Sequence, residues 1–421
     1  MNFLLQNLAV FLGLIIFTYF SWRKIEFGIY AIVFCLPLYL ARFNIFGIPS
    51  TALEAGIYIL FIIWLVKNYR QIKSVEIIPD KSLRLGIILL LVGVLISTFF
   101  SSELKTSAGI LKGWFVDPFL FFIILVSEIK TLTQRKNILK AFFFSGAAVA
   151  AVSLFYWFGF LSNGVSFDSR LHSFYLSPNY LAMYLSPALI VGIWMFLTAK
   201  KYFWLILSMI IALALYFTYS YSAWLSLFIA VIALVHYFFK EFSVRKKVYI
   251  FSVFCLLFAL ALFSQAEKDK FNVLKNLSYR SSYNSRLMIW QSAWEIGKDN
   301  WLIGIGPGNF QKYYLDYQAR FTEPYLEWAA PQPHNIFLAF WLETGILGLL
   351  GFLVILAWFF KCSLSLLKSN LLRRENFLLV AVLFSIMAYT IMHGLFDTTY
   401  WKNDLAIIFW LNLALLASIK K

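Results

Sequence analysis

The sequence predicts an all-α membrane protein, a helical bundle of about 12–13 transmembrane helices with one large extracytoplasmic loop. Of its 421 residues, 62% are hydrophobic and only 13% are charged, and the mean hydropathy is +0.78. Apolar runs of roughly 18 or more residues recur between short charged breaks. A soluble domain cannot bury that much apolar surface. In lipid, backbone amides must be bonded internally, so repeated runs of this kind indicate helices.

About thirteen segments have the length and composition of membrane helices, with boundaries accurate to about 2–4 residues. The first apolar run lacks a basic leader and a small-residue cleavage site, so we expect a retained helix. The three cysteines lie far apart in or beside apolar runs, which favours packing over disulfides or metal binding. The predicted helices cover residues 3–20, 25–42, 52–67, 84–101, 110–127, 138–159, 175–197, 202–219, 221–239, 247–264, 334–361, 376–395 and 403–419.

Basic residues are distributed unequally between the two sides that alternating loops define. One set of loops holds 23 of the 36 lysines and arginines, the other short loops hold five, and residues 265–333 hold eight. The positive-inside rule places the rich set in the cytoplasm. Most of the net charge of +16 therefore reflects topology, and we expect no nucleic-acid partner. The chain then divides into an N-terminal bundle (1–264), a large extracytoplasmic loop (265–333) and C-terminal membrane helices (334–421), within one integrated membrane domain.

The large loop contains a predicted amphipathic helix. In NSRLMIWQSAWEIGKDNW, residues 284–301, apolar side chains recur at helical spacing, and Asn284 or Ser285 is a suitable N-cap. Arg286 would then lie in the first turn, where free amides and a guanidinium can together hold an anion. The alternative is a solvated arginine on a surface helix. GIGPGN, residues 304–309, lacks the lysine of a phosphate loop and is expected to form a turn.

His334 stands in PQPHN, just before a predicted membrane helix. Pro331 and Pro333 restrict the path of the chain into that helix. The helix dipole disfavours the protonated imidazole, and a neutral histidine can accept a proton. His334 is therefore a candidate general base. The alternative is a histidine that caps a helix in the headgroup zone.

Other polar residues are expected on the same outer side. Arg170 precedes a predicted helix and either binds an anion or pairs with Asp168. His172, His393 and Asp397 have no metal-ligand spacing on one element. We expect no metal and no cofactor, because the outer face also lacks paired carboxylate or carboxylate–histidine motifs.

Two stretches resemble the core motif of the O-antigen ligase and polymerase family: RLMIWQSAWEI followed by GIGPGNF, and PHNIFLAFWLETGILGLLG. SPNYLAMYL, TYSYSAWL and FGIPSTALEAG are weaker, collinear matches. The resemblance implies a bundle related to the C-type glycosyltransferases, in the bacterial cytoplasmic membrane, with its active site on the extracytoplasmic side. It implies metal-independent, inverting transfer or polymerisation of a glycan from undecaprenyl diphosphate. The acceptor would be a glycan, a lipid or a protein.

The resemblance extends to single residues. The functional arginine and histidine of the family match Arg286 and His334, which it implies are catalytic. Asn335 completes the His-Asn pair and is expected to contact substrate.

One family residue is replaced. A further arginine usually follows serine in a T-x-S-R-G motif, whereas here Tyr221 follows Ser220. Tyrosine can donate a hydrogen bond to phosphate but brings no charge. We expect Arg170, with Arg280 as second choice, to supply the missing cation.

Two other functions predict different features in the sequence. A transporter or lipid flippase predicts charged residues near mid-membrane and internal repeats, and the sequence has few such charges and no convincing repeat. A structural protein of the envelope would not need Arg286 and His334 together.

Overall fold

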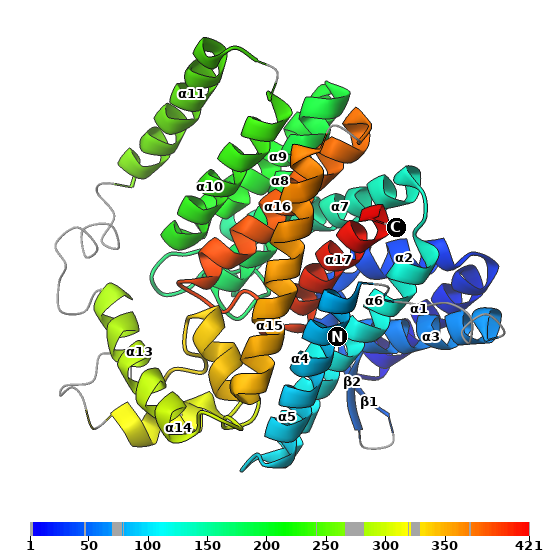
Figure 1. Ribbon diagram of the computed structural model, residues 1–421, viewed down its shortest axis with the longest axis vertical. Helices are drawn as coiled ribbons and strands as arrows, with labels where there is room; N and C mark the ends of the chain where they lie inside the picture. The colour runs from blue at the N-terminus through cyan, green and yellow to red at the C-terminus, as the bar shows by residue number, and fades with distance from the viewer. Residues whose placement is uncertain are drawn as a thin grey trace.

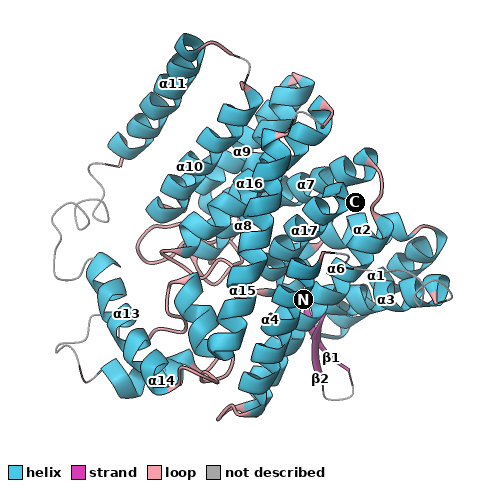
Figure 2. Ribbon diagram, in the orientation of Figure 1, coloured by secondary structure: helices cyan, strands magenta, loops and turns pink. Residues whose placement is uncertain are grey.

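The chain folds into a bundle of helices with one small hairpin in the part described (Figures 1 and 2). The computed structural model describes residues 3–45, 48–69, 78, 80–240, 242–265, 282–318, 320, 329–369 and 372–420. The predicted all-α membrane class is confirmed.

Each predicted membrane segment contains a helix. By length and composition, eight helices among the described residues can cross a membrane, and four more are shorter apolar helices, so the total of 12–13 spans stays a prediction. The helices are α1 (Phe3–Arg23), α2 (Ile25–Phe34), α3 (Ala52–Asn68), α4 (Lys81–Phe99), α5 (Leu104–Ile110), which continues through the π-helical η2 (Leu111–Val116) into α6 (Asp117–Glu128), α7 (Leu132–Trp157), α8 (Pro178–Ala199), α9 (Tyr202–Phe217), α10 (Tyr221–Phe238), α11 (Val244–Phe263), α15 (Ile336–Lys368), α16 (Arg374–Gly394) and α17 (Asn403–Lys420), and the large loop adds α13 (Ser282–Asp299) and α14 (Phe310–Gln318).

The helix predicted over residues 25–42 is shorter than expected. The α2 helix ends at Phe34, because Pro37 has no amide hydrogen and cannot continue the α-helical bonding. The rest of this segment and its continuation form a 3₁₀ turn and an antiparallel hairpin: η1 (Leu36–Leu40), β1 (Arg42–Ile45) and β2 (Ile48–Thr51).

The α15 helix packs closely against α4 through glycines. A Cβ atom added at Gly93 would lie 2.3 Å from the Gly348 nitrogen, and one added at Gly351 would lie 2.3 Å from the Leu90 nitrogen. Small residues let membrane helices approach to backbone contact in this way. The contact fixes the position of α15 in the bundle.

The α15 helix is broken at Gly345, whose backbone has φ 68° and ψ −176°. The large loop bonds to the backbone groups beside the break. The Ile305 amide donates to the Leu342 carbonyl at 2.7 Å, and the Ile346 amide donates to the Leu302 carbonyl at 3.2 Å. The break therefore forms the docking point of the large loop on the bundle.

The GIGPGN segment is a turn, as predicted. Gly304, Gly306 and Gly308 all have positive φ, between 79° and 84°. The Gly308 amide donates to the buried Glu343 carboxylate at 2.9 Å, and the Gly306 amide donates to Ser97 Oγ of α4 at 3.0 Å. The turn thus joins the loop to both α15 and α4.

The predicted amphipathic helix is present as α13, but only part of its apolar surface is buried. Ile289, Ala293 and Ile296 pack in a small core with Leu342 near the start of α15. Trp294, on a second apolar stripe, is 54% exposed. The buried stripe holds α13 against the start of α15, next to His334.

We expect Gly345→Ala to destabilise the protein by at least about 1–3 kcal/mol, because this region of φ and ψ is nearly restricted to glycine. The added Cβ would also lie 2.5 Å from the Leu302 carbonyl oxygen. Gly109→Ala in α5 is the control, since nothing lies within 4 Å of its added Cβ. Thermal unfolding in detergent measures both variants, and equal melting temperatures would contradict the prediction.

Candidate functional site

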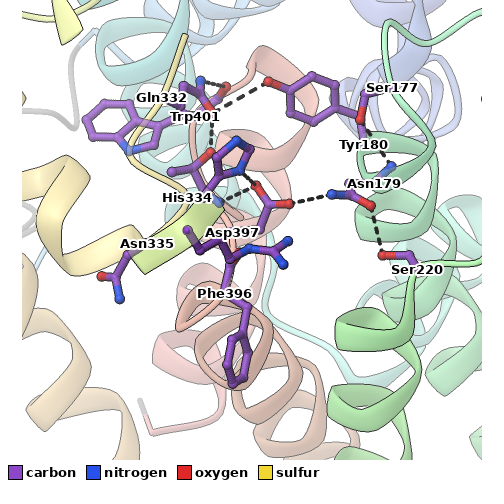
Figure 3. A network of polar contacts seen from close by, with 12 residues as sticks. Ser177, Asn179, Tyr180, Ser220, Gln332, His334, Asn335, Phe396, Asp397 and Trp401 are labelled. Atoms are coloured by element: carbon purple, nitrogen blue, oxygen red, sulfur yellow. Dashed lines mark hydrogen bonds and ion pairs between the residues drawn. The ribbon is translucent and has the colours of Figure 1, made fainter. Parts of the chain in front are cut away.

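Polar side chains from four segments meet at one end of the bundle (Figure 3). The segment before α15 contributes His334, and the α16–α17 loop contributes Asp397. The start of α8 contributes Asn179, and the turn between α9 and α10 contributes Ser220. Hydrogen bonds connect all four side chains in a single network.

His334 is paired with Asp397. The Nδ1 atom lies 3.1 Å from Oδ1 of the buried carboxylate, which also accepts from the Thr398 amide at 2.9 Å. An ionised carboxylate only accepts hydrogen bonds, so Nδ1 is the donor. In the neutral imidazole, the lone pair is then on Nε2. A histidine held in this way can accept a proton at Nε2, and Asp397 fixes the orientation of its ring.

The surroundings of Asp397 keep it ionised. Burial alone would raise the pKa of the Asp397 carboxyl, but the charge and hydrogen bond of His334, together with nearby His393 and Arg286, hold that pKa well below its usual range. Asn179 Nδ2 donates to the second oxygen at 2.9 Å. Both carboxylate oxygens are therefore satisfied inside the protein.

The backbone at His334 is held in an unfavourable conformation. Its φ is 47°, in the left-handed region that costs a non-glycine residue about 1–3 kcal/mol. Such strain persists only where neighbouring contacts impose it. The Trp290 indole of α13 donates to the His334 carbonyl at 3.4 Å, and the imidazole is held by Asp397.

Asn335 begins α15. Its Oδ1 accepts from the Phe337 amide at 2.9 Å and from the Leu338 amide at 3.1 Å, which makes it the N-cap. Its Nδ2 donates to the Leu395 carbonyl at 3.1 Å. The side chain thus fixes the helix start beside His334, and its predicted contact with substrate stays a prediction.

Arg170 is mostly buried, with 13% of its side chain exposed. Its Nε donates to the Thr218 carbonyl at 2.9 Å, and one terminal nitrogen donates to Asn179 Oδ1 at 2.8 Å. Ser220 donates to the same Asn179 oxygen at 3.0 Å. Arg170 also lies 3.7 Å from Asp168, so it has the predicted ion pair and a place in the network as well.

Asn179 is a bridge between Arg170 and Asp397. Burial lowers the pKa of the Arg170 guanidinium, the charges of Asp168 and Asp397 raise it, and the charge of Arg286 lowers it again. An arginine remains protonated at neutral pH. Two guanidinium groups therefore lie within electrostatic range of each other and of one buried carboxylate, which makes this end of the bundle attractive to anions.

Arg286 reaches the site from α13. The predicted helix start at residues 284–285 is wrong, because the helix already includes Ser282, and Arg286 is in its second turn. Arg286 therefore does not lie beside the free amides of a first helical turn, as the sequence had predicted. Its Nε donates to the Phe396 carbonyl at 2.9 Å, which places the arginine next to Asp397.

Three other predicted residues have different outcomes. Tyr221 is the first residue of α10 and lies within electrostatic range of Arg170. Arg280 falls outside the described residues. His172 donates from Nδ1 to the Tyr175 carbonyl at 2.8 Å, and no group of three metal-binding side chains occurs in the described ranges.

Sequence reasoning missed Asn179 and gave Asp397 no part in acid–base chemistry. Asn179 offers a weak signal, since it follows the Ser177–Pro178 start of a helix within one of the family-like stretches. No spacing relates residues 179, 334 and 397, because tertiary packing alone brings them together.

Residues 206–353 match the family described as O-antigen ligase. The match contains Tyr221, Arg286 and His334, whereas Arg170 and Asp397 lie outside it. The match confirms the predicted family resemblance over residues 206–353. No curated protein matches the chain at a significant level.

We expect Asp397→Asn to destabilise the protein by about 2 kcal/mol at neutral pH, because charge-assisted hydrogen bonds are lost. The folded pKa of Asp397 lies below the unfolded value of about 3.9. Its stabilisation is therefore complete above that value and is lost as the pH falls through the folded pKa. The difference in melting temperature between wild type and variant should therefore be constant above about pH 5 and should narrow as the pH falls below about 4 toward the folded pKa of Asp397.

Asp168→Asn provides the control for this experiment, since Asp168 is 53% exposed, lies 3.7 Å from Arg170 and otherwise accepts only from the neighbouring Ser166 hydroxyl among the described residues. Its melting temperature should stay close to that of wild type at every pH. A constant gap between wild type and Asp397→Asn down to pH 3 would mean that the carboxylate charge does not stabilise the fold.

Proposed function

We propose that this chain, which carries an O-antigen ligase family domain over residues 206–353, transfers a glycan from undecaprenyl diphosphate to an acceptor hydroxyl. The family match makes it a membrane protein of glycosyltransferase type. The proposal adds the donor, an inverting mechanism without metal, and a site at the outer face of the bacterial cytoplasmic membrane. The observation that carries it is the His334–Asp397 pair beside two arginines.

His334 serves as general base in this proposal. As the acceptor oxygen attacks the anomeric carbon, its proton passes to the Nε2 lone pair. The imidazolium that forms is stabilised by the buried Asp397 carboxylate, already in contact with Nδ1 at 3.1 Å. The same contact fixes the ring orientation, so Nε2 is directed by a hydrogen bond present before the substrate arrives.

The arginines act on the leaving group. The bond between the anomeric carbon and the diphosphate oxygen breaks on the face opposite the attack, and its electron pair goes to that oxygen. Arg286 and Arg170 stabilise the charge that develops on the lipid diphosphate. Each guanidinium group can bind two phosphate oxygens at once, so two arginines can stabilise the departing diphosphate without a metal ion. Displacement from the opposite face inverts the anomeric carbon.

Ligation and polymerisation are two uses of this chemistry. In ligation, the acceptor is a separate glycan, lipid or protein, whereas in polymerisation it is the next lipid-linked repeat. The polyprenyl donor arrives in the membrane, which suits a base and two cations at the end of a helical bundle. A glycan-lipid assay in cells without the gene would separate the two, through loss of ligated product or accumulation of single repeats.

We expect His334→Ala to reduce turnover by roughly 10²–10⁴-fold, the usual contribution of a general base. The assay uses purified protein, a polyprenyl diphosphate-linked glycan and excess chelator, since the proposal requires no metal. His236→Ala, near the opposite end of α10, is the control and should keep wild-type turnover. A His334→Ala protein with near-wild-type turnover, or wild-type activity that requires added magnesium, would contradict the mechanism.

We expect Arg170→Ala to lower donor use by roughly 10–100-fold, the value of one or two hydrogen bonds to a charged group. Adding Tyr221→Arg should restore part of this loss, because it places a cation within range of the same anion. Arg286→Lys should also be impaired, since lysine cannot form the fork. The KM for the donor should rise in each of these single variants.

The control for Arg170 is Asp168→Ala, which removes its ion-pair partner and leaves the cation in place. It should retain donor use. If it is as defective as Arg170→Ala, or if Tyr221→Arg restores nothing, Arg170 has a structural role and does not bind the diphosphate.

A further inference from the structure

A second polar region lies at the opposite end of the bundle. A cavity of about 550 Å³ is formed by the start of α7, the end of α8, the start of α9, the end of α10 and the start of α16. The His334 site lies at the other ends of these helices, beside the start of α8, the start of α10 and the end of α16. The two regions are therefore separated by the length of the helices.

The cavity is strongly basic. Four basic side chains and a single acidic one line it. Lys136 pairs with Glu375 at 2.8 Å, whereas the exposed Lys140 and Lys200 form no ion pair with any described residue. Arg374, which donates to a backbone carbonyl at 2.6 Å, is the fourth cation. The unbalanced positive charge makes the cavity attractive to an anion.

Two helices begin at this cavity without a side-chain cap. Trp204, in the first turn of α9, and Arg374, the first residue of α16, both line it, and neither helix has a side-chain hydrogen bond to its first amides. Free amides at a helix start carry a partial positive charge. They add to the attraction that the lysines exert on an anion.

The rest of the lining is apolar. Trp194, Met195, Leu378 and Trp204 supply much of it, beside the charged residues. Trp194 is buried, and its indole Nε1 has no hydrogen-bond partner among the described residues. Because that nitrogen is enclosed by the protein, Trp194 contributes apolar ring surface to the lining and no hydrogen-bond donor.

We propose that this cavity binds the headgroup of an anionic glycerophospholipid. The lysines and helix starts hold the phosphate, and the tryptophans and aliphatic side chains lie along the glycerol and upper acyl chain. Basic pockets between membrane helices bind anionic headgroups in this way, and interfacial tryptophans lie at headgroup level. A free phosphate offers the same charge but leaves the apolar lining unused. The inference is independent of the glycosyl transfer proposed for the other end.

The test measures lipid binding to the purified full-length protein by native mass spectrometry. Phosphatidylglycerol should bind in preference to phosphatidylcholine. The double variant Lys140→Gln and Lys200→Gln should weaken phosphatidylglycerol binding about 25-fold, since each lysine near the surface contributes about fivefold. The double variant Lys140→Arg and Lys200→Arg keeps both charges and should bind phosphatidylglycerol as the wild type does. Lys24→Gln with Lys130→Gln, two lysines of other loops, is the matched control and should change nothing.

A second arm separates a lipid from a free phosphate. Inorganic phosphate and glycerol 3-phosphate, at concentrations equal to that of the lipid, should not displace phosphatidylglycerol. Displacement by either would mean that the site takes a soluble phosphate, and would overturn the lipid assignment. Equal weakening by the Lys24 and Lys130 control would show that the lipid binds without using the cavity.

Discussion

The site depends on the burial of one carboxylate. A buried charge is costly unless it is paired and hydrogen-bonded, and Asp397 meets this requirement with donors from three parts of the chain. The imidazole of His334 comes from the segment before α15, and the amide of Asn179 comes from the start of α8. Loss of any one donor removes part of the compensation for a buried charge, so the carboxylate favours the arrangement in which all three segments meet.

The break at Gly345 supports this arrangement from the outside. The large loop bonds to the backbone beside the break and to α4, and α13 packs near the start of α15. This contact brings Arg286 to the carbonyl of Phe396, next to Asp397. An intact α15 would offer the loop no free backbone groups. The glycines of the family-like motif are thus explained by docking, while His334 and Arg286 are the residues of that motif to which we assign the proposed chemistry.

The sequence predicted the helices because hydropathy and helix length are local properties. The segment around Pro37 departed from the prediction, and some helix ends did as well: for example, α7 begins six residues before its predicted start, and α15 ends seven residues after its predicted end. Local context and family motifs led to His334 and Arg286 as candidates, and the structure places both beside Asp397. The sequence could not predict the pairing of His334 with Asp397, since residues 63 positions apart meet only through packing. The start of α13 was misplaced for a related reason: Asn284 and Ser285 are good caps, yet the helix already includes Ser282. A preferred cap indicates where a helix can begin, and it does not exclude an earlier start.

The two ends of the bundle gather cations in physically different ways. Arg170 is buried and already bonded to Thr218 and Asn179, so its guanidinium is fixed before any anion arrives. Fixed forks suit a diphosphate that must be held in one geometry while a bond breaks. Lys140 and Lys200 are exposed and flexible, and such ammonium groups attract a headgroup through charge without fixing its orientation. The choice of arginine at one end and lysine at the other therefore matches positioning for reaction in the first case and simple retention of a lipid in the second.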